Sequence, residues 1–223
     1  IGHNDLEYLE KTLKETKDQY QTRLVIIDGV YSQDGDLSLL PEIISLCKTH
    51  EAMLMLDDAH GIGVMGANGR GTAEHFNCLG QVDIITGTFS KSFGCVGGFA
   101  AASKKIIQYL KFYADSNVFS AAPTPQVTAS ILKALEIIKK EPAIRARLWE
   151  NTDYLRSRLT TEGFDIGKSV SPIFPIMIRD NKKVYEIAKM LQEKGIFTIG
   201  IVYPAVRTKE ARLRVSGLAT HEH

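Results

Sequence analysis

Two apolar runs in the middle of the chain each end in polar residues, and this arrangement constrains the fold more than any other feature of the sequence. The first run, MLML, leads into Asp57 and His60, and the second, IIT, leads into Thr88 and Lys91. In an open parallel sheet the ligand crevice lies just outside the carboxyl ends of the strands. If both runs are strands, an acid, an imidazole and an amine meet at one edge of a sheet.

This combination of side chains suits an aldehyde cofactor such as pyridoxal phosphate. The amine of Lys91 would form a Schiff base with the aldehyde, and the carboxylate would keep the ring nitrogen protonated. Hydroxyl groups beside the lysine could hold a phosphate, and the neighbouring glycines allow close backbone approach. An amine enclosed in such a pocket would have a lowered pKa, because burial disfavours its charged form, and would be a better nucleophile.

Each of these residues also has an ordinary structural interpretation when it is taken alone. Asp57 could cap a helix or sit in a solvated turn, His60 could be a hydrogen-bonded core histidine, and Lys91 could be an exposed lysine. Strand alternation sends Asp58 to the opposite face of the sheet from Asp57. We therefore take Asp57 rather than Asp58 as the acid of the site.

The surrounding segments predict an α/β domain over residues 1–140. A short β-branched run predicts a buried strand, an amphipathic segment predicts a helix after it, and the MLML run predicts the next strand. Strand, helix and strand in this order form a parallel crossover unit. The predicted strands are 23–27, 53–56, 82–87 and 97–102, and the predicted helices are 5–17, 40–50, 104–113 and 125–140.

A smaller α+β domain is predicted over residues 141–223. Pro142 begins a helix that runs to the Gly163 stop and links the two domains. Short apolar runs that are typical of strands then follow, with a segment of helical periodicity between the first two. They predict strands at 172–178, 196–202 and 213–216 and a helix at 182–194.

Composition excludes several classes of function. The chain has 27 Lys and Arg against 26 Asp and Glu, so its net charge of +1 gives no case for nucleic acid or an anionic membrane. No segment approaches the length of a membrane span. Three unpaired cysteines fit a reducing cytoplasm. We expect no metal site, and the terminal His221-Glu222-His223 is expected to be solvated.

The stretch GIGVMG, Gly61 to Gly66, matches the dinucleotide-binding glycine pattern, but its context does not fit. That pattern must follow a strand directly and open a helix, whereas here polar and small residues intervene and more glycines follow. We interpret it as a turn whose backbone lies close to a neighbouring element. A nicotinamide dehydrogenase is accordingly the weakest functional alternative.

Two further residues are candidates for the same site. Ser32 follows the first strand in a loop that could equally be a plain turn. Arg214 lies inside the strand LRVS, where burial without a partner would be heavily penalised. A carboxylate of the protein or of a substrate is its natural partner.

Four blocks of the sequence resemble the α-oxoamine synthase family of pyridoxal-phosphate enzymes in order and spacing. They are DGVYSQDGDLSLLPEI, MLDDAHGIGVMGANGRGTAEHF, VDIITGTFSKSFGCVGGF and ARLRVSGLATH. The resemblance implies fold type I of the PLP-dependent transferases, a mostly parallel sheet flanked by helices, and a homodimer with its site at the subunit interface. It also implies condensation of an amino acid with an acyl-CoA and loss of carbon dioxide.

The resemblance assigns roles to individual residues. Lys91 matches the Schiff-base lysine, which later acts as the base, and Asp57 matches the partner of the ring nitrogen. His60 and Ser32 match contacts of the ring hydroxyl, and His60 could also donate to the acyl carbonyl. Thr88 matches a contact of the cofactor phosphate, and Ser120 matches a contact of the phosphate of the partner subunit's cofactor. Arg214 matches the residue that binds the substrate carboxylate.

The chain departs from the family in three places. The family commonly has Glu where this chain has Asp28, and Asp-Glu where it has Asp57-Asp58. The role of the shorter acid at position 28 is therefore left open. The family's glycine-rich phosphate turn and its ring-stacking aromatic residue belong to an N-terminal portion that we expect to be missing here, so the fragment alone is not expected to complete the site.

Within the family, the runs LWENTDYLRSRLTTEGFDIG and SPIFPIMIRDNKK resemble bacterial members that condense serine with palmitoyl-CoA to 3-ketosphinganine. Members that make 8-amino-7-oxononanoate, or that transfer acetyl to glycine, are the alternatives, so the amino acid could be serine, glycine or alanine. A fold-type I aminotransferase and a non-catalytic subunit are alternatives of other classes. The presence of Lys91 argues against the second.

Overall fold

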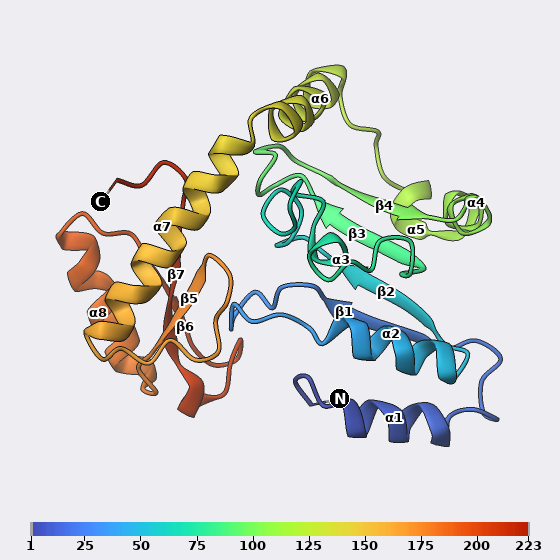
Figure 1. Cartoon of the computed structure of the whole chain (residues 1–223), viewed down its shortest axis with the longest axis horizontal. Helices are drawn as coiled ribbons and strands as arrows, with labels where there is room; N and C mark the ends of the chain where they lie inside the picture. The colour runs from blue at the N-terminus through green and yellow to red at the C-terminus, as the bar shows by residue number, and fades with distance from the viewer. Residues whose placement is uncertain (1, 223) are drawn as a thin grey trace. The chain divides into compact units, whose positions relative to one another are not determined.

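The computed structural model describes residues 2–222, and the chain divides into two compact units. The first comprises residues 2–30 and 38–142, and the second comprises residues 31–37 and 143–222. The predicted division lay at 140/141, and the short insertion 31–37 of the second unit was not anticipated. Figure 1 shows the elements of both units in chain order.

The first unit contains a four-stranded sheet in the order β1-β2-β3-β4. The strands β1, β2 and β3 are parallel and β4 is antiparallel to β3, so the expected mostly parallel sheet is present. The strands are β1 (Leu24–Asp28), β2 (Met53–Asp57), β3 (Ile84–Thr88) and β4 (Gly98–Ala102). The helices are α1 (Leu6–Glu15), α2 (Leu40–Thr49), α3 (Thr72–His75), α4 (Lys104–Tyr113), α5 (Asp115–Val118) and α6 (Pro125–Lys140).

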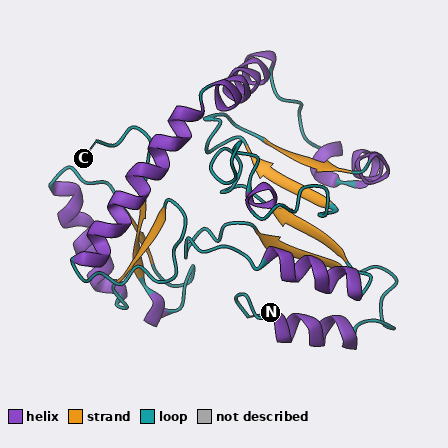
Figure 2. Ribbon diagram, in the orientation of Figure 1, coloured by secondary structure: helices purple, strands orange, loops and turns teal. Residues whose placement is uncertain are grey.

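The core of the first unit lies where α1 and α2 cover one face of the sheet, as Figure 2 shows. Leu54 and Leu56 of β2 point into this core, and alternation places Met53, Met55 and Asp57 on the other face. Apolar side chains at helical spacing line the facing sides of the two helices. They include Leu9, Leu13, Ile43, Ile44 and Cys47.

The prediction of a buried strand at 23–27 is wrong for one face of β1. Leu24 is 44% exposed and Ile26 is 62% exposed, whereas Val25 between them is buried. The strand lies at the edge of the sheet, and only its face toward α1 and α2 is covered within the described residues. A β-branched run alone does not distinguish a strand that is covered on both faces from one that is covered on one.

The second unit contains a three-stranded antiparallel sheet in the order β5-β7-β6. Its core joins Val184 of the last helix to Ala211 and Leu213. Polar residues cap this helix, since the Asp180 side chain accepts from the backbone N–H of Lys183 at 3.0 Å. The elements are α7 (Pro142–Thr161), β5 (Ile173–Met177), α8 (Asn181–Glu193), β6 (Ile199–Ile201), the 3-10 turn η1 (Thr208–Glu210) and β7 (Arg212–Ser216).

The segment 31–37 belongs to the second unit because its backbone forms hydrogen bonds with residues of that unit. The carbonyl of Gly35 accepts hydrogen bonds from the backbone N–H groups of Val170 and Ser171, both at 3.1 Å. Gly35 has a φ of 70°, and a Cβ at this position would overlap the carbonyl oxygen of Ile173. Glycine is therefore required at the point where the segment packs against β5.

The sequence predicted neither a membrane span nor a metal site. Among residues 2–222, no helix has the length and apolar character of a membrane span. Nor does this part of the chain bring together three side chains able to bind a metal ion. The terminal histidine of the His-Glu-His stretch lies outside the described residues.

Candidate active site

Two carboxylates lie next to each other at the C-terminal edge of the first unit's sheet. Asp28 ends β1 and Asp57 ends β2, and the two residues are register partners. Asp57 is in turn the register partner of Thr86 on β3, two residues before Thr88. Because the three strands are parallel, the polar residues that follow them share one edge of the sheet.

The electrostatic environment connects these acids with Lys91. Burial raises the pKa of the Asp28 carboxyl, and the negative charge of Asp57 raises this pKa further. The positive charge of Lys91 acts in the opposite direction on the same pKa. Asp28 therefore senses both Asp57 and Lys91, and it belongs to the electrostatic environment of the site.

The side chain of Asp57 is half-buried and turns back onto the chain that follows it. Its Oδ1 accepts a hydrogen bond from the backbone N–H of Ala59 at 3.0 Å. This bond begins the turn that carries His60, which is also half-buried. Acid and imidazole are thus held in one short turn, as their spacing in the sequence indicated.

Asp58 lies on the opposite face, which confirms the prediction from alternation. Its side chain is fully buried and accepts two hydrogen bonds from Thr72, one from the backbone N–H at 2.7 Å and one from the hydroxyl at 2.6 Å. Sequence reasoning missed the role of Thr72, which begins the short helix α3. Glycines at positions 29, 61 and 71 surround the same carboxylate and were the available signal.

The loop from Thr88 to Gly97 carries Lys91 and is ordered by its own hydroxyl groups. The Thr88 and Ser90 hydroxyls lie 2.8 Å apart, and the Thr88 Oγ1 also accepts from the backbone N–H of Ser90 at 3.1 Å. The Ser92 hydroxyl donates to the carbonyl of Ile62 at 2.8 Å. This last bond attaches the lysine loop to the glycine-rich turn after β2.

The expectation of an enclosed amine at position 91 is wrong for the described chain, because Lys91 is exposed. The strand β4 lies at the edge of the sheet, and the described residues leave the loop between β3 and β4 open to solvent. Enclosure needs covering atoms from beyond the loop, and the local composition of the sequence contains no information about them.

The GIGVMG stretch forms turns rather than a phosphate loop, as predicted. Gly63 and Gly66 both have a φ of 82°, a region that favours glycine. A Cβ on Gly63 would lie 2.6 Å from the Cβ of Ser92. The glycine is therefore needed where this turn packs against the lysine loop.

Ser32 and Arg214 are brought together in the second unit. The Arg214 Nε donates to the carbonyl of Ser32 at 2.6 Å, and its Nη1 donates to the hydroxyl of Ser216 at 3.1 Å. Burial lowers the pKa of the Arg214 guanidinium. Among the described hydrogen bonds of Arg214, the partners are a carbonyl and a hydroxyl rather than a protein carboxylate, so a substrate carboxylate stays the candidate.

A second arginine of the same strand was missed. The Arg212 side chain is 4% exposed and its Nη1 lies 2.5 Å from the Oδ1 of Asp34, which is 45% exposed. The same nitrogen donates to the carbonyl of Gln33 at 3.1 Å, and Nε donates to the carbonyl of Glu210 at 2.7 Å. The buried arginine that needs a carboxylate from the protein is therefore Arg212 and not Arg214.

Ser120 lies in the segment that joins α5 to α6. Ala102, the last residue of β4, pairs with Ile84, the first residue of β3, so the chain leaves the sheet at the edge opposite to Lys91. Figure 1 draws α4 and α5 toward that opposite edge, and Ser120 follows α5 and is exposed. Its predicted contact with the cofactor of a partner subunit stays a prediction.

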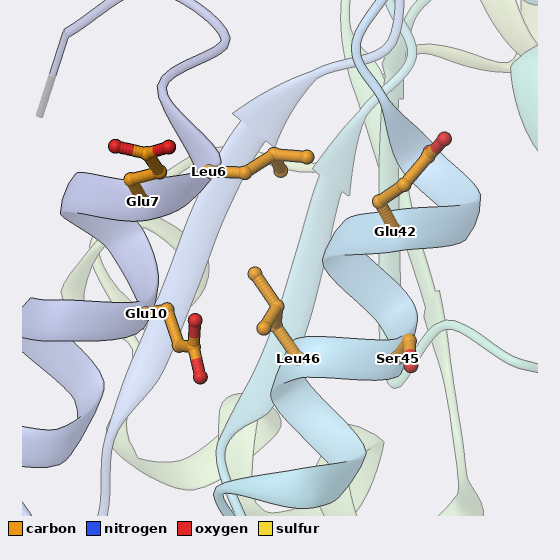
Figure 3. A pocket seen from close by; sticks show the side chains of 6 residues that line it. All are labelled: Leu6, Glu7, Glu10, Glu42, Ser45 and Leu46. Carbon is orange, nitrogen blue, oxygen red and sulfur yellow. The ribbon is translucent and has the colours of Figure 1, made fainter.

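A hollow between α1 and α2 is unrelated to these residues. Figure 3 shows the side chains of Leu6 and Leu46 between the two helices, with the lining residues Glu7 and Glu10 on α1 and Glu42 on α2. Glu10 forms an ion pair with Lys14, whose Nζ lies 2.6 Å from the Glu10 Oε1. The hollow contains none of the predicted site residues.

The chain is similar to known enzymes along its whole length. Residues 2–223 match the model of the family described as aminotransferase class I and II. The chain is 46% identical to the serine palmitoyltransferase of Sphingobacterium spiritivorum over 99% of this chain and 55% of the relative. It is also 46% identical to the 8-amino-7-oxononanoate synthase of Petrotoga mobilis over 98% of this chain and 56% of the relative.

Solved structures show the same similarity. The serine palmitoyltransferase of Sphingomonas wittichii superposes with a TM-score of 0.93 at 32% identity, over 99% of this chain and 55% of that one. A serine palmitoyltransferase from S. paucimobilis with a bound PLP-myriocin aldimine gives the same TM-score and identity, over 99% of this chain and 56% of that one. These similarities confirm fold type I of the PLP-dependent transferases. The chain spans about half the length of the curated relatives it matches.

Proposed function

The chain belongs to the aminotransferase class I and II family, and we propose that the whole protein is an α-oxoamine synthase that condenses serine with palmitoyl-CoA. The reaction releases carbon dioxide and CoA and gives 3-ketosphinganine. The observation that supports it best is the alignment of Asp28, Asp57 and the lysine loop at adjacent strand ends, with Asp28 sensing the charges of both Asp57 and Lys91.

The residues present fit pyridoxal phosphate by the chemistry of their donors and acceptors. A primary amine, a half-buried carboxylate, an imidazole and a pair of linked hydroxyls follow neighbouring strands of one sheet. When bound, this cofactor supplies an aldehyde and a ring that accepts electrons from the substrate. Lys91 would hold the aldehyde, Asp57 the protonated ring nitrogen, and Thr88 the phosphate, with Ser120 of a second copy also reaching the phosphate.

Side chains of this chain would transfer the protons and orient the cofactor ring. The amine of Lys91 would also be the base that removes the α-proton of the amino acid. The Asp57 carboxylate would hold a proton on the ring nitrogen, and His60 and Ser32 would orient the ring through its hydroxyl. His60 also donates a hydrogen bond to the acyl carbonyl.

Arg214 binds the carboxylate of the amino acid. Its backbone-bound Nε fixes the guanidinium plane, because the bond to the carbonyl of Ser32 is only 2.6 Å long. A planar guanidinium that is fixed in this way can donate two parallel hydrogen bonds to a carboxylate.

The choice of serine and palmitoyl-CoA as the two substrates is the more specific part of the proposal. Relatives named serine palmitoyltransferase and 8-amino-7-oxononanoate synthase share the same 46% identity with this chain. The sequence runs at 148–167 and 171–183 favour serine and palmitoyl-CoA, and the second candidate is the synthesis of 8-amino-7-oxononanoate.

We also propose that the protein acts as a homodimer. The helices α4 and α6 and the segment between them present large apolar side chains to solvent in the described chain, and such surfaces commonly mark protein interfaces. Phe112 is 78% exposed, Phe119 is 84% exposed and Leu132 is 62% exposed. A second copy of the chain would cover them and bring its Ser120 to the cofactor.

Release of CoA thiol by the whole protein loaded with pyridoxal phosphate tests the reaction. Serine, glycine and alanine should each be paired with acyl-CoAs of different chain length. We expect serine with palmitoyl-CoA to be fastest, Lys91→Ala to lose both the Schiff-base absorbance and thiol release, and Lys105→Ala, a surface control, to keep both. Preference for alanine or glycine would favour a different synthase. Transfer of the amino group without thiol release from any acyl-CoA would instead identify an aminotransferase.

A further inference from the structure

The fully buried carboxylate of Asp58 lies one residue from Asp57, on the side of β2 that faces away from the proposed site. Both of its oxygens are hydrogen-bonded to one residue, since Oδ2 accepts from the Thr72 backbone N–H at 2.7 Å and Oδ1 accepts from the Thr72 hydroxyl at 2.6 Å. Burying a charged group is costly unless it is compensated. A carboxylate at this position therefore calls for an explanation.

Three glycines from separate segments pack directly against this carboxylate. A Cβ on Gly29 would lie 2.5 Å from Oδ1, and a Cβ on Gly61 or Gly71 would overlap the carboxylate oxygens. Gly29 follows β1, Gly61 follows His60, and Gly71 precedes α3. One side chain is thus in contact with the end of a neighbouring strand and with both ends of the glycine-rich turn.

The backbone of Asp58 holds the turn that carries His60. Its carbonyl accepts from the N–H groups of Gly61 and Ile62, both at 3.0 Å. Its own N–H donates to the carbonyl of Thr86 on β3 at 2.8 Å. The residues on either side of His60 are therefore fixed relative to β2 and β3.

The same turn reaches the lysine loop. The carbonyl of Ile62 accepts the hydroxyl hydrogen of Ser92 at 2.8 Å, and Ser92 follows Lys91 in the chain. Gly63 packs against Ser92 so closely that a Cβ would lie 2.6 Å from the Ser92 Cβ. A continuous series of contacts therefore connects Asp58 with the residue next to Lys91.

We infer that Asp58 is a positioning residue, which holds the turn of His60 and, through Ile62 and Ser92, the loop of Lys91. It does not touch the reacting atoms and acts through these neighbours. The consequence for catalysis rests on the proposed function, whereas the structural connection between Asp58 and the lysine loop does not.

Asp58→Asn tests the need for two acceptor oxygens at nearly unchanged volume. An asparagine offers one carbonyl oxygen and one NH2 group, so it can no longer accept from both the backbone N–H and the hydroxyl of Thr72, and the hydroxyl must turn to accept from the NH2 group instead. Thr72→Val removes the hydroxyl donor while the backbone donor stays, and Thr72→Ser restores the hydroxyl. This pair keeps the test informative if Asp58→Asn does not fold.

Asp83→Asn is the control, at an aspartate that is exposed rather than buried. The Asp83 Oδ2 also accepts a backbone N–H, that of Leu54 at 2.8 Å, but it does so at the N-terminal ends of β2 and β3. The substitution therefore has the same chemistry at the edge of the sheet that lies away from Lys91.

The first measurement is amide hydrogen exchange of the whole protein without added substrate. We expect Asp58→Asn and Thr72→Val to raise exchange by about tenfold in segments 59–71 and 89–97, since loss of a buried hydrogen-bond partner costs a factor of this order. Thr72→Ser and Asp83→Asn should leave segment 89–97 unchanged. Unchanged exchange at 89–97 in both Asp58→Asn and Thr72→Val would overturn the inference, whether or not the proposed reaction is correct.

The second measurement is a pH titration of the absorbance of the protein loaded with pyridoxal phosphate. We expect Asp58→Asn and Thr72→Val to weaken the binding of pyridoxal phosphate by about tenfold and to shift the midpoint of the titration, with Thr72→Ser restoring both. A merely structural role would lower thermal stability and leave the midpoint in place, and that result would contradict a positioning role.

Discussion

Asp28 and Asp57 are register partners on adjacent parallel strands, and the charge of Asp57, added to burial, raises the pKa of the Asp28 carboxyl. The pair thus places two like charges side by side at the edge where Lys91 supplies the opposite charge. This relationship makes the electrostatic balance of the site open to direct measurement.

Asp28→Asn should raise the stability of the protein at neutral pH. Since folding raises the pKa of Asp28, the folded chain binds this proton more tightly than the unfolded chain does. The contribution to stability is therefore present at low pH and is lost as pH rises through the folded pKa. Thermal unfolding at several pH values should show the variant above the wild type near pH 7, with the difference narrowing as pH falls toward the unfolded Asp value of about 3.9. A variant less stable than the wild type at pH 7 would contradict this account.

Arg214→Lys should raise the KM for the amino acid by about ten- to a hundredfold, because an ammonium cannot replace the two parallel hydrogen bonds of a guanidinium. The KM for the acyl-CoA should change little. Steady-state kinetics of the whole protein measure both constants. Arg207→Lys, an exposed arginine before η1, is the control, and equal changes in both KM values would speak against a carboxylate contact.

Asp34→Ala should destabilise the protein by about 1–3 kcal/mol, less than for a fully buried pair because Asp34 is 45% exposed. The substitution leaves the buried Arg212 with carbonyl partners only. Urea unfolding measures the loss. Glu162→Gln removes an exposed ion pair with Arg158 at 3.3 Å and should cost less than about 0.5 kcal/mol. Equal effects of the two variants would show that burial of Arg212 does not matter.

Gly61→Ala should destabilise the protein by about 1–3 kcal/mol, since the added methyl group would overlap the buried carboxylate of Asp58. Gly217→Ala is the comparison, because the nearest atom to its Cβ would lie at 3.5 Å, an ordinary contact distance. Thermal unfolding of the two variants gives the difference. A Gly61→Ala protein as stable as Gly217→Ala would mean that the turn shifts without cost.

Local patterns predicted most of the elements of this chain. The helices at 104–113 and 125–140 have the predicted bounds, because Ser103 and Thr124 cap them and Pro125 begins the second. Alternation also placed Asp57 and Asp58 on opposite faces correctly. These features depend on neighbours in the sequence, which is the information that periodicity and capping contain.

Features that depend on distant parts of the chain were missed. The exposed face of β1, the exposure of Lys91 and the attachment of residues 31–37 to the second unit all depend on what packs against these residues. Arg212 was missed because its partner, Asp34, lies 178 positions away in the sequence. The roles of the site residues themselves were inferred from resemblance, and they stay predictions.

The insertion at 31–37 makes the path of the chain cross between the two units at 30/31, 37/38 and 142/143. A protease that cleaves at 142/143 would leave residues 31–37 covalently attached to the first unit, while their hydrogen bonds still hold Val170 and Ser171 of the second. Expressing residues 143–222 alone would also omit Asp34, the counter-ion of the Arg212 guanidinium. The smaller unit is therefore not a separable module of this polypeptide, even though its core is its own.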